Sequence, residues 1–173
     1  YSIYLLSLKE WNLDKWMNRL VFKPLKNIGH RLDFLTVKNV FYFFVPLYAI
    51  GLFFLFQESI VNPLILKYLT EVFSFIGLVM VLKSFGERQS PRLSWLLVIM
   101  NHCWIALAVS FNEHFDGSHT LFYLSGVAVS GLVGFLCLDI LRRKEKKYFN
   151  LNGYYGHVYE YQILSAVFLL SSL

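Results

Sequence analysis

The chain has 173 residues, of which 57% are hydrophobic and only 16% are charged, and its mean hydropathy is +0.51. Soluble domains are roughly 45–50% apolar and about 25% charged, so this composition argues against a soluble domain and indicates a membrane protein. The net charge of +5 does not indicate nucleic-acid binding, because the basic residues lie between apolar runs and not among stacking aromatic residues.

Residues 1–39 are predicted to form a cytoplasmic, amphipathic juxtamembrane segment. Near-helical spacing among Lys and Arg is shown by Trp11, Trp16, Leu20 and Ile28, and it is typical of a helix lying on an anionic membrane surface. Pro24 is expected to break or kink this helix. The segment is interpreted as a membrane anchor, and a docking surface for a partner subunit is the alternative.

Residues 40–173 are predicted to form an all-α membrane domain, a polytopic bundle of about five transmembrane helices. Four apolar blocks approach the roughly 20 residues that cross a bilayer, and a fifth is interrupted by the end of the sequence. A soluble bundle is the disfavoured alternative, because charges are nearly absent from whole blocks instead of lining one face. Since the sequence starts without Met and stops inside an apolar run, we expect an internal fragment of a longer protein. The expected spans are 40–57, 64–85, 93–111, 120–141 and, incomplete, 161–173.

The connectors between these blocks alternate in charge. Basic residues dominate 1–39, the connector that holds Arg88 and Arg92, and the run "RRKEKK" at 142–147. The intervening connectors at 58–63 and 112–119 carry acidic residues and neither Lys nor Arg. Under the positive-inside rule this pattern predicts a cytoplasmic N-terminal segment. The expected location is an integral position in the bacterial cytoplasmic membrane.

Five ionisable side chains fall inside the predicted spans, and each costs about 2.5–3.5 kcal/mol on insertion scales. They are Lys67, Glu71, Lys83, His102 and Asp139. Lys67 and Glu71 are four residues apart and can form an ion pair on one helix face. Lys83 and Asp139 lie near the cytoplasmic ends of their spans, so they are expected to extend to the interface, Asp139 with help from Arg142.

His102 is the ionisable residue that lies deepest in the predicted membrane. It follows Arg92 by roughly 15 Å at 1.5 Å per residue, which is about mid-depth. Glu71 is expected to reach a similar level from the opposite surface, within reach of the imidazole or of one bridging water. Because histidine titrates near neutral pH, the pair is suited to a proton relay. Alternatively, Asn101 and His102 form helix-to-helix hydrogen bonds that fix packing, and both interpretations stay open.

Two other patterns carry weaker predictions. His114 and His119 flank Asp116 and could form an external metal site, although no third neutral ligand is near in the sequence. The small residues of "SGVAVSGLVG", 125–134, indicate close helix packing. No resident metal, cofactor or catalytic motif is predicted.

The stretch "RLSWLLVIMNH", residues 92–102, resembles a segment of the antiporter-like subunits of respiratory complex I and of Mrp-type cation/proton antiporters. In that family a basic residue opens a membrane helix and a histidine often follows ten positions later, and Arg92 and His102 occupy these positions. The order of spans and the basic loop before "NLNGYYG" also fit, over roughly 64–173. The chain departs from the family at "SWLLVIM", where small residues are usual, and near Gly131, where many members have a lysine.

The resemblance implies a fragment of a proton-conducting subunit of an energy-transducing membrane complex. His102 would carry protons, and Asn101 would orient it or hold water beside it. Glu71 and Lys83 would relay or tune charge, and Arg92 would stand at the cytoplasmic mouth. Implied partners are the lipid bilayer, other membrane subunits, and protons or small cations. Such subunits serve NADH-quinone oxidoreductase-like, hydrogenase and inorganic-carbon uptake complexes. A non-conducting scaffold that anchors partner subunits is the first alternative, and an intramembrane enzyme, for which no adequate residue cluster is visible, is the second.

Overall fold

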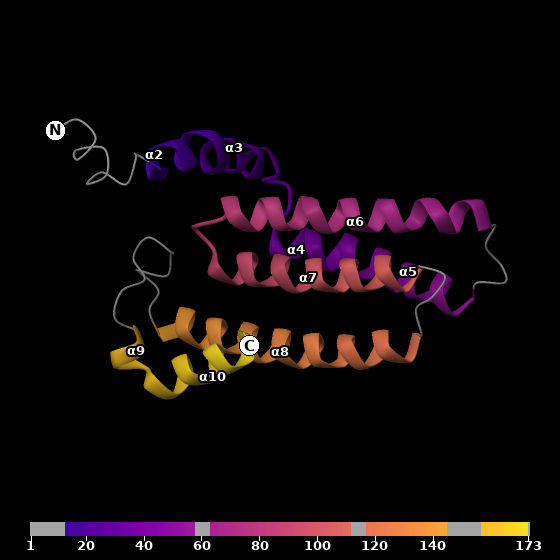
Figure 1. Cartoon of the computed structure of the whole chain (residues 1–173). Coiled ribbons are helices and arrows are strands. Elements are labelled where there is room, and N and C mark those ends of the chain that lie inside the picture. Colours follow the sequence, from indigo (N-terminus) through magenta and orange to yellow (C-terminus); the bar gives the residue numbers. More distant parts are fainter. Residues whose placement is uncertain (1–12, 58–62, 112–116, 145–156, 173) are drawn as a thin grey trace.

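The computed structural model describes residues 13–57, 63–111, 117–144 and 157–172, and all of its elements there are helices (Figure 1). The prediction of an all-helical fold is therefore confirmed for the described residues. Four helices are long and apolar enough to cross a bilayer, and a fifth apolar helix is shorter, at 11 residues. The four are Val37–Phe56, Tyr68–Gly86, Pro91–Ser110 and Ser118–Lys144.

The first helical run, residues 13–31, is called the N-terminal helix below. It consists of α2 (Leu13–Met17), the π-helical segment η2 (Asn18–Phe22) and α3 (Lys23–Arg31). The helix continues through Pro24, so of the two expected outcomes, a break or a kink, the break does not occur. A proline ring clashes with the carbonyl four residues before it, and the wider π turn that precedes Pro24 relieves this clash.

The second run repeats this solution around another proline. It consists of α4 (Val37–Asn39), the π-helical segment η3 (Val40–Phe44) and α5 (Val45–Phe56), with Pro46 in the first turn of α5. The hydroxyl of Thr36 accepts a hydrogen bond from the backbone N–H of Asn39 and caps the start of the run. The chain steps down within a few residues of α3, continues in the same general direction and passes behind α7 (Figure 1).

Three long helices form the body of the molecule: α6 (Pro63–Gly86), α7 (Pro91–Ser110) and α8 (Gly117–Lys144). Successive helices run in opposite directions, with α7 between α6 and α8 (Figure 1). Ser90 caps α7 by accepting a hydrogen bond from the N–H of Leu93, and Pro91 occupies the first turn, where its missing N–H needs no partner. The C-terminal ends of α6 and α8 and the start of α7 therefore meet at one end, called the basic end below.

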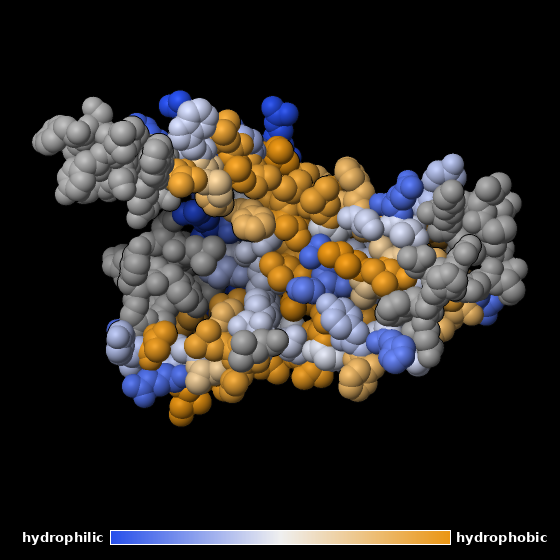
Figure 2. Space-filling view, in the orientation of Figure 1, coloured by the Kyte–Doolittle hydropathy of each residue, from blue (hydrophilic) through white to orange (hydrophobic). Residues whose placement is uncertain are grey.

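Trp104 of α7 is the centre of the core. Its side chain is fully buried, and its ring lies 5.3 Å from that of Tyr48 and 5.4 Å from that of Phe73. These two rings come from α5 and α6, so one tryptophan joins three helices. By contrast, large apolar side chains such as Phe75 and Phe122 are exposed. Apolar residues cover much of the face that Figure 2 shows. Exposed apolar faces of this kind are expected where a helix contacts lipid.

The last described elements, α9 (His157–Glu160) and α10 (Gln162–Ser172), fold back along α8 (Figure 1). Phe168 of α10 contacts Trp95 of α7, with ring centroids 5.1 Å apart. The start of α10 therefore lies near the basic end, and the helix closes one side of a groove between α7 and α8.

Candidate functional site

The candidate site is an open groove between α7, α8 and α10, with a volume of about 570 Å³. Trp95 and His102 line it from α7, Tyr123 and Ser130 from α8, and Ser171 from α10. Figure 2 shows a hydrophilic area in the middle of this face, along the course of α7 and between apolar surfaces. The groove thus places polar groups at mid-length of helices that are otherwise apolar.

His102 and Tyr123 form the polar pair of this groove. The Nδ1 atom of His102 lies 2.9 Å from the hydroxyl of Tyr123, and the tautomer of the ring decides which group donates. Both side chains are exposed to the groove. His102 therefore makes a helix-to-helix hydrogen bond, which is one of the two interpretations that its sequence context left open. The sequence analysis missed Tyr123, because nothing local identifies which aromatic residue of the next helix faces His102.

Glycines of α8 allow this close approach of α7. A β-carbon at Gly134 would collide with the ring of Trp95, and one at Gly131 would lie 2.9 Å from Cγ2 of Ile99. The indole Nε1 of Trp95 also donates to the backbone carbonyl of Gly131 over 3.0 Å. The predicted packing role is confirmed for these two glycines, whereas a β-carbon at Gly126 would meet open space.

Asn101 and His102 face different helices. Asn101 is buried against α6, where its Oδ1 lies 3.0 Å from the position of a β-carbon on Gly77. Consecutive residues on an α-helix point about 100° apart, so the two side chains contact opposite neighbours of α7. Asn101 therefore belongs to the α6–α7 contact and does not orient His102, while its alternative role of holding water stays a prediction.

Glu71 lies away from His102. Gly77 of α6 lies opposite Asn101, and Phe73 lies near the end of α7, with its ring 5.6 Å from that of Phe111. Glu71 is exposed and comes two residues before Phe73, so it lies roughly 9 Å from Gly77 along the helix axis. The expected meeting of Glu71 with His102 is wrong, since Glu71 is on α6 and His102 faces α8. The side chain of Lys67 lies outside the described residues, so its pairing with Glu71 stays a prediction.

Lys83 is the centre of an ion-pair cluster at the basic end. Its side chain is buried, and Nζ lies 2.6 Å from Oδ1 of Asp33 and 3.1 Å from Oε2 of Glu87. Lys83 donates a hydrogen bond that holds the pKa of the Asp33 carboxyl below its ordinary value. Lys83 thus points toward the basic end and ends on Asp33, in the turn after α3, whose own side chain is exposed; that it reaches the membrane interface stays a prediction. Asp33 was missed because it lies outside every predicted span.

A second cluster joins α7 to α8 at the same end. Arg92 donates from Nη1 to Oδ1 of Asp139 over 2.5 Å, and Arg143 donates from Nε to Oδ2 of Asp139 over 2.9 Å. Arg143 follows Asp139 by four residues and reaches it along one helix face. The expected helper was Arg142, but the arginine of α8 that pairs with Asp139 is its neighbour Arg143. Arg92 also lies over the ring of Phe135, 5.8 Å from its centroid.

We expect Arg92→Ala to lower the midpoint of thermal unfolding in detergent by a few degrees, because Asp139 then loses its partner on α7. Arg143 keeps one ion pair with Asp139, and the pair is partly solvated, which limits the effect. The charge-swapped double variant Arg92→Asp with Asp139→Arg should recover part of the loss. If the loss in the double variant equals the sum of the losses in Arg92→Asp alone and Asp139→Arg alone, the two residues are not coupled directly.

The structure does not bring the five proposed relay residues together. Lys83 and Arg92 are both at the basic end but in separate ion-pair clusters, and Glu71 and Asn101 contact neither. Of these five residues, only His102 lines the groove between α7 and α8. Residues 112–116, which hold His114 and Asp116, lie outside the described residues, and the described residues contain no group of three potential metal ligands.

No family model, curated protein or solved structure matches this chain. The likeness of residues 92–102 to antiporter-like subunits therefore stays a prediction from that stretch and its context. The four long apolar helices suggest a membrane-embedded protein, and this is the class to which the fold points.

Proposed function

We propose that this chain is a membrane-embedded scaffold subunit whose groove between α7 and α8 receives another membrane subunit. One observation carries the proposal: the charged residues expected to relay protons are held apart, so His102 faces an open groove with only Tyr123 as its polar partner among the contacts described. A polar pair at mid-depth is expensive to leave facing lipid. A partner helix that covers the groove would remove this cost and could hydrogen-bond with His102.

The proposed orientation follows from the distribution of charge. The N-terminal helix, the connector that holds Arg88, and the end of α8 with Arg142 and Arg143 all lie toward the basic end (Figure 1). By the positive-inside rule, this end and the N-terminal helix face the cytoplasm, in a bacterial cytoplasmic membrane. In the same proposal α10 is part of a fifth span, and the other subunits of the complex are the partners.

Proton conduction is the second candidate, and the hydrogen bond between His102 and Tyr123 favours it. A histidine that exchanges a proton with a tyrosine hydroxyl in a groove lined by serines has the elements of one relay step. Partner helices would then have to supply the remaining groups, since Glu71 and Lys83 contact neither residue. This candidate retains the antiporter-like assignment and gives His102 the role of proton carrier.

The test compares His102→Gln and Tyr123→Phe with the parent in the full-length protein and its native complex. Partner retention in detergent and proton flux in vesicles are both measured. For the scaffold we expect partner retention to fall about five-fold per variant, because a hydrogen bond between membrane helices contributes about 1 kcal/mol.

Matched controls are His119→Gln and Tyr68→Phe, which change the same residue types at exposed positions outside the groove. They should leave both readouts unchanged. If His102→Gln abolishes proton flux while partners stay bound in full, the scaffold proposal is wrong and conduction takes its place. If neither readout changes in the groove variants, both proposals fail.

A further inference from the structure

A second groove, of about 830 Å³, lies between the N-terminal helix and the basic end of α6. Five of the side chains that line it are cations, and none of its lining residues is acidic. The cations are Lys15, Arg19, Lys23 and Lys26 on the N-terminal helix and Arg88 in the connector after α6. Such a concentration of like charge repels itself unless an anion is present. The groove is therefore complementary to a negatively charged ligand.

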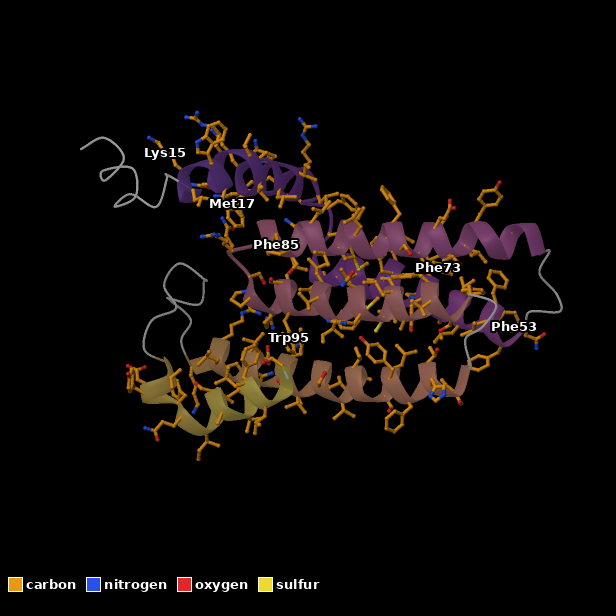
Figure 3. All side chains as sticks on the ribbon, viewed as in Figure 1. Lys15, Met17, Phe53, Phe73, Phe85 and Trp95 are labelled. Atoms are coloured by element: carbon orange, nitrogen blue, oxygen red, sulfur yellow. The ribbon has the colours of Figure 1, made fainter. Side chains whose placement is uncertain are left out.

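The same groove has apolar walls. Phe22 of the N-terminal helix and Phe85 of α6 both line it, and they are 51% and 64% exposed. Figure 3 shows Phe85 at the end of α6, below Lys15 and Met17 of the N-terminal helix. Two exposed aromatic rings beside a basic row match a ligand that combines an anionic head with an apolar tail.

The basic row results from the register of the N-terminal helix. Lys15, Arg19, Lys23 and Lys26 follow one another at intervals of three or four residues, which places them along one face. Because the helix continues through the π turn of η2 and Pro24, the row is not interrupted at Lys23. A break at Pro24 would have separated Lys26 from the other three.

Two contacts hold the N-terminal helix against α6 and thereby form the groove. Gly29 and Gly86 bring the two backbones together, since a β-carbon at Gly29 would lie 2.9 Å from Cα of Gly86. Four residues further along the chain, Asp33 pairs with the buried Lys83. The groove is therefore built by tertiary contacts and does not depend on a bound molecule to assemble it.

We propose that this groove binds one anionic phospholipid, with its phosphate among the basic side chains and an acyl chain against Phe22 and Phe85. The groove lies at the basic end of the apolar helices, which is the level of lipid headgroups for a protein in this orientation. Arg and Lys together bind phosphate strongly, Arg through two parallel hydrogen bonds and Lys as a point charge. Free phosphate shares this headgroup chemistry, but it does not use the apolar walls.

The test is a titration of the full chain in a zwitterionic detergent with dioleoylphosphatidylglycerol, followed by native mass spectrometry. Dioleoylphosphatidylcholine and inorganic phosphate are titrated in parallel. The groove variant combines Arg19→Gln with Lys23→Gln. The control combines Arg31→Gln with Lys38→Gln, which removes the same charge from exposed positions outside the groove.

We expect the groove variant to bind dioleoylphosphatidylglycerol about thirty-fold more weakly than the parent, because each basic residue near an anionic lipid contributes roughly a five-fold change. The control should bind within about two-fold of the parent. Phe85→Ala should weaken lipid binding without changing the effect of inorganic phosphate. Circular dichroism of each variant checks that the helices are retained.

Three results would overturn the proposal. Equal losses in the groove variant and the control would mean that only net charge attracts the lipid. Equal affinity for dioleoylphosphatidylcholine would remove the role of the basic row. Displacement of the lipid by millimolar inorganic phosphate, with Phe85→Ala binding as the parent does, would make the groove a phosphate site and not a lipid site.

Discussion

Lys83→Ala is expected to lower the free energy of unfolding by about 3 kcal/mol, because it removes a buried side chain that two carboxylates need. The ammonium of Lys83, whose side chain is only 4% exposed, is held between Asp33 and Glu87. Alanine would leave a cavity where the aliphatic chain lies, and it would leave Glu87 without its cation. Unfolding by SDS in mixed micelles, followed by circular dichroism, measures the loss.

Lys83→Met separates the two parts of this effect. Methionine keeps most of the buried volume and loses the charge, so we expect it to cost about half as much as alanine. Glu87 retains two hydrogen bonds in either variant, because its Oε1 accepts from the backbone N–H groups of Gln89 and Ser90. Equal stability of Lys83→Met and the parent would show that the ion pairs with Asp33 and Glu87 add nothing to packing.

The Asp33 pair also makes stability depend on pH. The hydrogen bond from Lys83 lowers the pKa of Asp33 in the folded state. The stabilisation by this pair is therefore fully present above the pKa that Asp33 has in the unfolded chain, and it is lost as pH falls through the lower pKa of the folded state. We therefore expect this contribution to begin to fall below about pH 4 and to be lost once the pH is below the lowered pKa of Asp33 in the folded state. Asp33→Asn should remove that part of the acid dependence, and an unchanged pH profile in this variant would contradict the assignment.

Gly29→Leu is expected to detach the N-terminal helix from α6. A β-carbon at Gly29 would lie 2.9 Å from Cα of Gly86 and 3.0 Å from the carbonyl oxygen of Leu82, and neither backbone atom can move alone. Overpacking of this kind costs about 1–3 kcal/mol. Hydrogen exchange of the backbone amides in residues 13–31 should therefore become faster by about ten-fold or more, while exchange in α7 stays as in the parent.

Gly126→Ala is the matched control for this variant. Gly126 also lies inside a helix, but a β-carbon there would have no neighbour within 4 Å. We expect this substitution to be neutral or slightly stabilising, since alanine favours helix more than glycine does. If exchange of residues 13–31 stays slow in Gly29→Leu, the two backbones can move apart at this crossing without releasing the N-terminal helix. The ion pair between Asp33 and Lys83 would then be enough to hold it.

The predictions for Lys83→Ala and Gly29→Leu also concern the proposed lipid site. The contact between Gly29 and Gly86 and the ion pair between Asp33 and Lys83 both lie next to the basic groove. A variant that releases the N-terminal helix should therefore also lose bound phospholipid, even though all five groove cations remain. The groove variant Arg19→Gln with Lys23→Gln should do the reverse, losing lipid while amide exchange stays slow.

The corrections at Glu71 and Asn101 share one cause: the sequence indicates depth along a helix but not rotation about its axis. Glu71 and His102 were matched by depth, but they face different neighbours. Lys83 and Asp139 lie near the basic end as predicted, but their partners include Asp33, in the turn after α3, and Arg92, on α7. Local spacing identifies partners only within one helix, as it does for Arg143 and Asp139.

The sequence by itself determined the helical class, the long apolar helices and the clustering of basic residues at one end. These features depend on composition and on spacing along the chain, and they need no knowledge of which helices touch. Only the tertiary structure decided that Tyr123 faces His102, that Asp33 covers Lys83, and that the N-terminal helix lies against α6 at Gly29. Such contacts depend on how each helix is rotated and on which backbones can approach closely, and side-chain packing between segments far apart in sequence determines both.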